Sequence, residues 1–202
     1  MNFFLYFFFL ILFIFFLNFI LRKKNFLIST TGDNHQKFAS SETIPLSGGI
    51  LIFLGLIYFY NQNFLLFYVF SFLILVLGFF SDLKLLKSAT LRLIIQVSLV
   101  VFFVFFTELK ILDTRIFALD KLLENIFFNY LFVSFCILIL INGSNFMDGL
   151  NTLNVGYYIL ICIIIYFLRS EELVIYQDNL TFFILLILVI VFIINILNKM
   201  FL

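Results

Sequence analysis

Residues 141–152, INGSNFMDGLNT, bring amide and carboxylate side chains into one short polar run between two apolar segments. Four of them recur every three residues: Asn142, Asn145, Asp148 and Asn151. On a helix, positions three apart drift slowly around the axis, so all four can face one polar pocket at the end of a membrane span. The alternative is a polar turn between two membrane helices, in which Gly143 and Gly149 break the helix.

A second polar cluster occupies residues 78–96, GFFSDLKLLKSATLRLIIQ. Asp82 stands where an apolar run ends, and three basic side chains that follow could meet phosphate oxygens in the headgroup zone. These are Lys84, Lys87 and Arg92. Basic residues in an inner loop are also what membrane topology alone requires. A lone acid among them does little for topology, which makes Asp82 the more informative residue.

A third cluster, residues 35–49, HQKFASSETIPLSGG, contains the chain's one histidine and one proline. Pro45 and the glycines that follow predict a helix that begins close against a neighbouring backbone. The free amides of such a helix start also suit a phosphate, and Lys37 lies nearby. His35 is more simply a surface residue than a catalytic base, because no partner for it is identifiable.

Composition places the elements that carry these clusters in a membrane. Hydrophobic residues make up 65% of the chain and charged residues 11%, with a mean hydropathy of +1.25. Soluble domains typically have about 45–50% apolar residues, so we predict an all-α polytopic transmembrane bundle. A net charge of +1 without a basic face predicts no nucleic-acid partner. Cys136 and Cys162 lie in apolar runs and predict neither a disulfide nor a metal site.

Seven apolar runs approach the roughly 20 helical residues that cross a bilayer. We expect spans near residues 3–21, 44–60, 63–80, 91–107, 126–141, 153–168 and 179–198. The basic run Arg22, Lys23 and Lys24 after the first span predicts a cytoplasmic end there, and therefore an N-terminus outside. Alternation then places the three polar clusters inside. The segments 108–125 and 169–178 fall outside, as ordinary solvated loops.

The distribution of charge supports this orientation and argues against transport. Eight basic residues fall inside: Arg22, Lys23, Lys24, Lys37, Lys84, Lys87, Arg92 and Lys199. Four fall outside: Lys110, Arg115, Lys121 and Arg169. No ionisable residue lies deep within a predicted span, although proton and ion paths normally need such residues. Polar groups at cytoplasmic helix ends instead suit an enzyme that joins a soluble substrate to a lipid.

In this order, the three clusters resemble the polyprenyl-phosphate N-acetylhexosamine-1-phosphate transferase family over nearly the whole chain. The family's H…TPxxGG loop is matched by His35 and residues 43–49. Its GxxDD…RxxxQ block is matched by Gly78, Asp82, Arg92 and Gln96, although Ser81 stands where the family has its first aspartate. Its NxxNxxDG block, the most specific of the three, is matched from Asn142 to Gly149.

The resemblance implies one multi-pass transferase domain, residues 1–202, in the bacterial inner membrane. Its chemistry would be the attack of undecaprenyl phosphate on a UDP-N-acetylhexosamine, with Mg²⁺, to give a lipid diphosphate-sugar and UMP. Members are longer and carry a later metal-binding aspartate, so the resemblance also implies C-terminal truncation and an unknown metal site, with Asp148 as one candidate. Dimers are common in the family.

The resemblance assigns roles to residues of each cluster. Asp82 would orient or deprotonate the lipid phosphate, while Asp148 and Asn145 would bind the nucleotide sugar or the water shell of the metal. The remaining predicted substrate contacts are Asn142, Asn151, Lys37, Lys84 and Arg92. The sugar and the glycan pathway, whether peptidoglycan, O-antigen or another, stay open. So does the alternative of a non-catalytic membrane subunit or a remnant of the enzyme.

Overall fold

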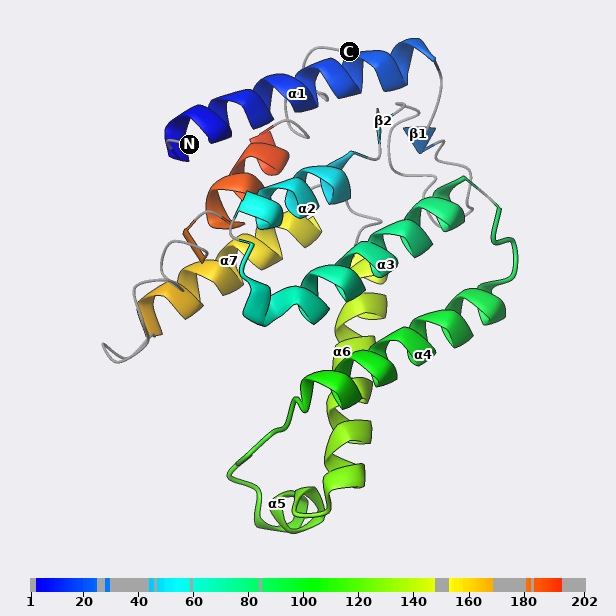
Figure 1. The fold of residues 1–202 in the computed structure, drawn as a ribbon, viewed down its shortest axis with the longest axis vertical. Helices are drawn as coiled ribbons and strands as arrows, with labels where there is room; N and C mark the ends of the chain where they lie inside the picture. Colours follow the sequence, from blue (N-terminus) through cyan, green and yellow to red (C-terminus); the bar gives the residue numbers. More distant parts are fainter. Residues whose placement is uncertain are drawn as a thin grey trace. The chain divides into compact units, whose positions relative to one another are not determined.

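In the computed structural model, the regular elements of the described residues are helices and one pair of two-residue strands. The structure describes residues 3–24, 28–29, 44–45, 47–58, 60–83, 85–147, 153–168, 181–182 and 184–193. Within them the α-helices are long and apolar, which confirms the all-α prediction and is compatible with a membrane helix bundle. Figure 1 shows the order of these elements along the chain.

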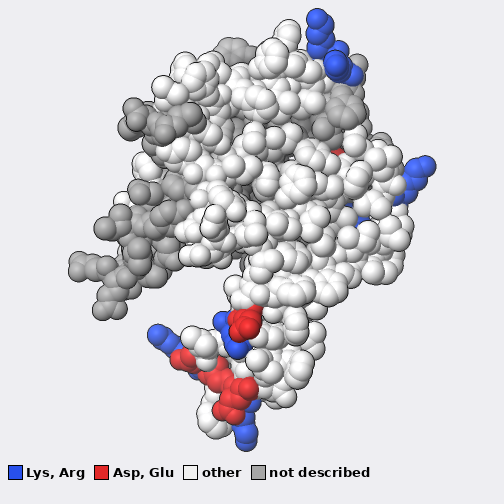
Figure 2. All heavy atoms as spheres, in the orientation of Figure 1, with Lys and Arg blue, Asp and Glu red and all other residues white. Residues whose placement is uncertain are grey.

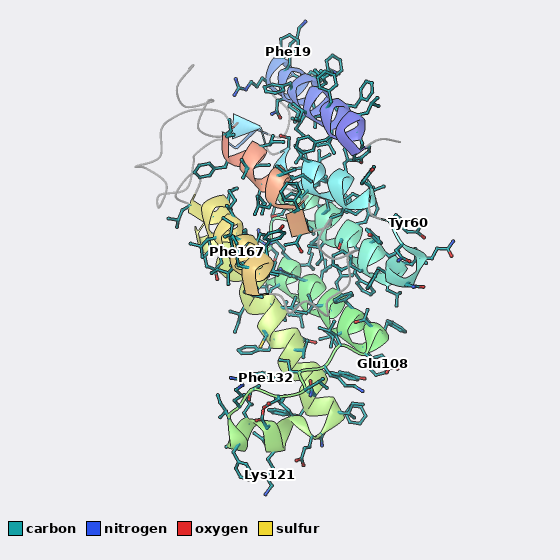
Figure 3. The ribbon with its side chains drawn as sticks, turned by 90° about the vertical axis from the view of Figure 1, so that its left-hand side faces the viewer. Phe19, Tyr60, Glu108, Lys121, Phe132 and Phe167 are labelled. Atoms are coloured by element: carbon teal, nitrogen blue, oxygen red, sulfur yellow. The ribbon has the colours of Figure 1, made fainter. Side chains whose placement is uncertain are left out.

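Four helices are long and apolar enough to cross a membrane. They are α1 (Phe3–Lys23), α3 (Leu65–Asp82), α4 (Ala89–Thr107) and α6 (Ile126–Met147). Their outward side chains are aromatic and aliphatic: Phe19 on α1 is 64% exposed and points away from its helix in Figure 3. A helix that is apolar on all sides is typical of a membrane span, because lipid meets the outward face.

Among the described residues, four of the seven expected spans are helices of spanning length and three are shorter apolar helices. The other three predicted spans appear as α2 (Gly48–Tyr58), α7 (Leu153–Leu168) and a last helix, Ile184–Ile193. At 1.5 Å per residue, the eleven residues of α2 extend only about 16 Å, roughly half of a hydrocarbon core. Residues 179–180, 183 and 194–198 of the last predicted span lie outside the described residues.

The start of the second predicted span differs from the expectation. Strand β2 (Ile44–Pro45) pairs antiparallel with β1 (Ile28–Ser29), so Pro45 stands in a short strand and α2 begins only at Gly48. Proline fits an extended segment, since its fixed φ suits it and an edge strand needs no N–H from it. A Cβ on Gly48 would lie 3.9 Å from the Val191 side chain, which is ordinary van der Waals contact, and the predicted close approach of this helix start to a neighbouring backbone stays a prediction.

The first of two compact units comprises Met1–Tyr60 and Met147–Leu202. Its core joins Leu10 and Ile14 of α1, Leu51 of α2 and Ile187 of the last helix. Two hydrogen bonds join α1 to α2 and to the residue that precedes it. The Tyr6 hydroxyl donates to the Leu54 carbonyl oxygen at 2.6 Å, and the Ser47 hydroxyl donates to Asn18 Oδ1 at 2.5 Å.

The second unit, Asn61–Phe146, contains α3, α4, the short α5 (Phe117–Leu123) and nearly all of α6. Helices α3 and α4 form an antiparallel hairpin (Figure 1), in which the Phe70 and Phe103 rings lie 5.4 Å apart. Val100 and Val104 of α4 pack against Val133 of α6. The prediction of a single domain, residues 1–202, stays a prediction.

Candidate active site

The turn between α3 and α4 carries the second polar cluster. Asp82 is the last residue of α3 and is exposed, and α4 begins after Ser88, whose hydroxyl caps it by accepting from the Leu91 N–H at 3.3 Å. Arg92 lies on the first turn of α4, and its Nη1 donates to the Ser81 hydroxyl oxygen at 2.7 Å. This hydrogen bond joins the end of one helix to the start of the next beside Asp82.

The Ser81–Arg92 contact has a chemical consequence for the guanidinium. Ser81 takes one of its five N–H donors and contributes no charge of its own, so this contact leaves the positive charge of Arg92 intact. A guanidinium held in this way presents donors with a fork geometry that matches two phosphate oxygens. The arrangement suits an anionic headgroup arriving at the exposed end of the hairpin.

Helix α6 carries the first half of the Asn-rich motif. It runs without a break through Gly143 to Met147, so the alternative in which Gly143 breaks the helix is wrong at this position. Asn142 and Asn145 therefore lie on one helix, about 60° apart around its axis. Asn142 Nδ2 donates to the Leu138 carbonyl oxygen at 2.9 Å, which uses one of its two amide donors.

The two groups of polar residues in this unit lie on helices that share a connection. Residues 108–125 join the end of α4 to the start of α6. Arg92 lies near the start of α4 and Asn142 near the end of α6, so each lies at the end of its helix that is farther from this segment. Close to that segment, the Phe105 and Tyr130 rings of the two helices lie 6.0 Å apart. Four predicted site residues lie outside the described residues: Lys37, Lys84, Asp148 and Asn151.

The other compact unit contains a buried polar atom without a hydrogen-bond partner, on a residue that the sequence-based site prediction does not include. Asn154, near the start of α7, continues the three-residue spacing of Asn142 and Asn145. Its Oδ1 is buried and has no hydrogen-bond partner among the described residues. A buried acceptor without a donor costs about 1–3 kcal/mol, so an unpaired amide oxygen marks a place where a ligand donor would be stabilising. Extending the spacing by one more step would have found it.

The donor set fits magnesium only in part. Among the described residues, no group of three or more His, Cys, Asp or Glu side chains comes together to hold a metal. Magnesium is commonly bound by one or two carboxylates together with substrate phosphates. Asp82, exposed at the end of α3, therefore fits as a single oxygen ligand beside a bound phosphate.

The fold defines a class: a helical protein, compatible with a membrane helix bundle, whose described helix ends carry polar side chains. Residues 64–194, nearly two thirds of the chain, match the model of Glycosyl transferase family 4. The chain belongs to this family, that of the polyprenyl-phosphate hexosamine-1-phosphate transferases. Membership implies a membrane phospho-sugar transferase that uses a polyprenyl phosphate.

The match includes the α3–α4 hairpin and the Asn-rich motif and begins after the third polar cluster. The resemblance therefore rests on residues 64–194 and covers less of the chain than the expected near-whole length. Family members are generally dependent on Mg²⁺. No curated protein and no solved structure matched the chain.

Proposed function

We propose that this protein transfers an N-acetylhexosamine-1-phosphate from a UDP-sugar to undecaprenyl phosphate. The reaction takes place at the cytoplasmic face of the bacterial plasma membrane and begins a lipid-linked cell-envelope glycan. The observation that supports it most is the hairpin inside the family match, where Ser81 holds Arg92 beside Asp82. Lipid phosphate and nucleotide sugar are both anionic, and this hairpin offers a positive fork and a carboxylate at a helix end.

The transfer needs no change of oxidation state. An oxygen of the lipid phosphate attacks the phosphorus that bears the sugar, a new P–O bond forms, and the bond to UMP breaks. Positioning and charge neutralisation dominate such phosphoryl transfers. Mg²⁺, when bound, supplies further neutralisation of the developing negative charge.

Each residue has a proposed part in this step. Arg92 contacts the phosphate of the lipid with the donors that Ser81 leaves available. Asp82 orients the same phosphate or accepts its proton. Asp148 and Asn145 hold the nucleotide sugar or the water shell of the metal, together with Asn142 and Asn151. Lys37 and Lys84 add phosphate contacts.

The test is a transfer assay on the purified chain in detergent. It contains undecaprenyl phosphate, Mg²⁺ and a panel of UDP-N-acetylhexosamines labelled in the sugar. The expected result is label in the organic phase and release of an equal amount of UMP. A chain that retains its helical circular dichroism and gives neither product with any sugar contradicts the proposal for this chain and favours a non-catalytic membrane subunit or a remnant of the enzyme. Asp113→Asn, an exposed change far along the chain from the motifs, should keep wild-type activity.

A further inference from the structure

The segment that joins α4 to α6, residues 108–125 and here called the connector, has an unusual surface. It was expected to be a solvated outer loop. Instead it carries the two largest exposed fractions among the big apolar side chains of the described residues, 91% for Leu112 and 85% for Phe117. Ile116 and Leu122 are also more than half exposed, at 58% and 54%. Several large exposed apolar side chains on one short segment are typical of a contact with lipid or with another protein.

The connector does not project away from the helices that it joins. Glu108 turns the chain sharply after α4 with a φ of 51°. The buried Asn129 of α6 then holds the connector at two points: Nδ2 donates to the carbonyl oxygens of Ile111 at 2.8 Å and Leu123 at 3.0 Å, and Oδ1 accepts from the Ile111 N–H at 3.0 Å. Figure 1 shows α5 beside the start of α6.

These contacts set the level of the connector along the axis of α6. Asn129 is three residues into α6, or about 4.5 Å along its axis. Because α4 and α6 are both long and apolar enough to span a membrane, we take this first turn to lie at the edge of the hydrocarbon. Ile111 and Leu123 face inward, since Ile111 packs on the Val100–Val104–Val133 cluster and Leu123 is buried. Their neighbours Leu112 and Leu122 face outward at the same level.

The connector also carries charged side chains, which can lie among the lipid headgroups in an interfacial segment. Figure 2 shows basic and acidic side chains gathered at this end of the second unit, and Lys121 points away from α6 in Figure 3. Lys110 lies 5.7 Å above the Tyr130 ring. Three bases stand against four acids in residues 108–125, so attraction to anionic lipid does not drive the contact. Long basic side chains can still reach the headgroups while apolar neighbours enter the acyl region.

We propose that the connector lies in the membrane–water interface, with Leu112 and Phe117 inserted among the acyl chains of the adjoining leaflet. We choose lipid as the neighbour of this surface because the connector is continuous with α4 and α6. Lipid that surrounds these two helices would meet the connector at the level of Asn129. The interaction is independent of catalysis and depends on apolar insertion. High salt should therefore leave it unchanged.

The chain contains no tryptophan, so one substitution creates a single fluorescent reporter. Phe117→Trp is reconstituted in phosphatidylcholine vesicles whose acyl chains carry bromine either near the headgroup or near the chain end. We expect blue-shifted emission and stronger quenching by the shallow bromine, at low and high salt alike. Phe102→Trp, on an outward position of α4, is the deep reference and should respond more to the deep bromine.

Tryptophan itself prefers membrane interfaces, so a matched control must show that this preference alone does not produce the result. Asp113→Trp introduces the same residue at an exposed polar position of the connector and should be quenched mainly by aqueous iodide. Leu112→Trp repeats the test at a second site. The proposal is overturned if iodide quenches Phe117→Trp and Leu112→Trp as strongly as it quenches Asp113→Trp. Blue-shifted emission that ignores brominated lipid and changes with the protein-to-lipid ratio also overturns it, since a second copy would then cover the surface.

Discussion

Ser81 and Arg92 show how a neutral side chain can prepare a charged one for a ligand. The hydroxyl accepts a hydrogen bond of 2.7 Å from the guanidinium and leaves its charge uncompensated by this contact. A carboxylate at position 81, as the family resemblance would have it, would instead pair with the guanidinium and compete with an incoming phosphate. The residue that first looked like a lost carboxylate thus has a positioning role in the proposed function.

Arg92→Ala should lower kcat/KM for undecaprenyl phosphate by about 10- to 100-fold, since a hydrogen bond to a charged group contributes about 1.5–3 kcal/mol. Arg92→Lys should recover only part of the loss, because lysine lacks the planar fork. Initial rates at varied lipid concentration measure the effect. Arg115→Ala, a charge removed from the connector, should leave the rates unchanged, and equal losses in both variants would argue against a specific role for Arg92.

Asp148→Asn should abolish turnover, since it removes the one carboxylate of the Asn-rich motif while keeping its size. UMP release in the transfer assay measures this loss. The matched control is Asp113→Asn, an identical chemical change at an exposed connector position. Wild-type turnover by Asp148→Asn would remove Asp148 from the proposed mechanism.

At the scale of elements, the connector is a folded piece of structure with its own polar network. Asn129 satisfies three main-chain groups of residues 111 and 123. Asp120 Oδ1 accepts from the Thr114 N–H at 2.8 Å and from the Thr114 hydroxyl at 2.6 Å. These contacts determine where the exposed apolar side chains of the connector point, because they fix the backbone between α4 and α6.

Asn129→Leu should destabilise the protein strongly, because three main-chain groups lose their partner and each buried unpaired group costs about 1–3 kcal/mol. The melting temperature in detergent and the rate of proteolysis within residues 108–125 measure the change. Ser98→Ala removes a side-chain hydrogen bond to the Ile94 carbonyl oxygen at an exposed position of α4 and should have little effect. Similar melting temperatures for both variants would contradict the role of Asn129.

Asp120 should make the order of the connector depend on acid pH. The hydrogen bonds from Thr114 hold the pKa of the Asp120 carboxyl below its ordinary value. Its stabilising contribution is therefore complete above the unfolded-state pKa of about 3.9 and is lost as the pH falls through the lower folded-state pKa. Proteolysis of the connector by an acid-stable protease should accelerate in that range, and Asp120→Asn should reduce this acceleration.

At the scale of the whole molecule, the described helices divide into two compact units, each with its own apolar core. Four helices have the length of a span, and three apolar helices are shorter. The family match extends over α3 to the last helix and so includes both polar regions of the proposed site. The orientation across the membrane stays a prediction, and it has a direct test.

A cysteine introduced at Lys24 should react with an impermeant thiol reagent only after the cells are opened, because the basic run after α1 is predicted to be cytoplasmic. A cysteine at Asp113 should react in intact cells. Labelling of the two variants with and without permeabilisation measures this difference, and the unaltered chain gives the background from Cys136 and Cys162. The reverse pattern would mean that the N-terminus lies inside.

The order of apolar and polar residues in the sequence predicted much of the helical architecture. Runs such as 91–107 and 126–141 predicted α4 and α6, because a backbone in lipid must satisfy its hydrogen bonds within a helix. The spacing of polar residues at the helix ends likewise predicted the family that the match confirmed. Helix ends were less predictable, as α6 shows by continuing past Gly143, because glycine weakens a helix without forbidding it.

Only the tertiary structure could decide the contacts between distant residues. Ser81 and Arg92 meet because the hairpin brings two helix ends together, and Asn129 reaches Ile111 across 18 residues because the chain turns back at Glu108. The direction in which Leu112 and Phe117 point depends on the same turn. Composition and spacing determine which segments enter a membrane, since transfer from water to lipid acts on each segment separately. Hydrogen bonds between segments depend on geometry, and geometry exists only once the chain has folded.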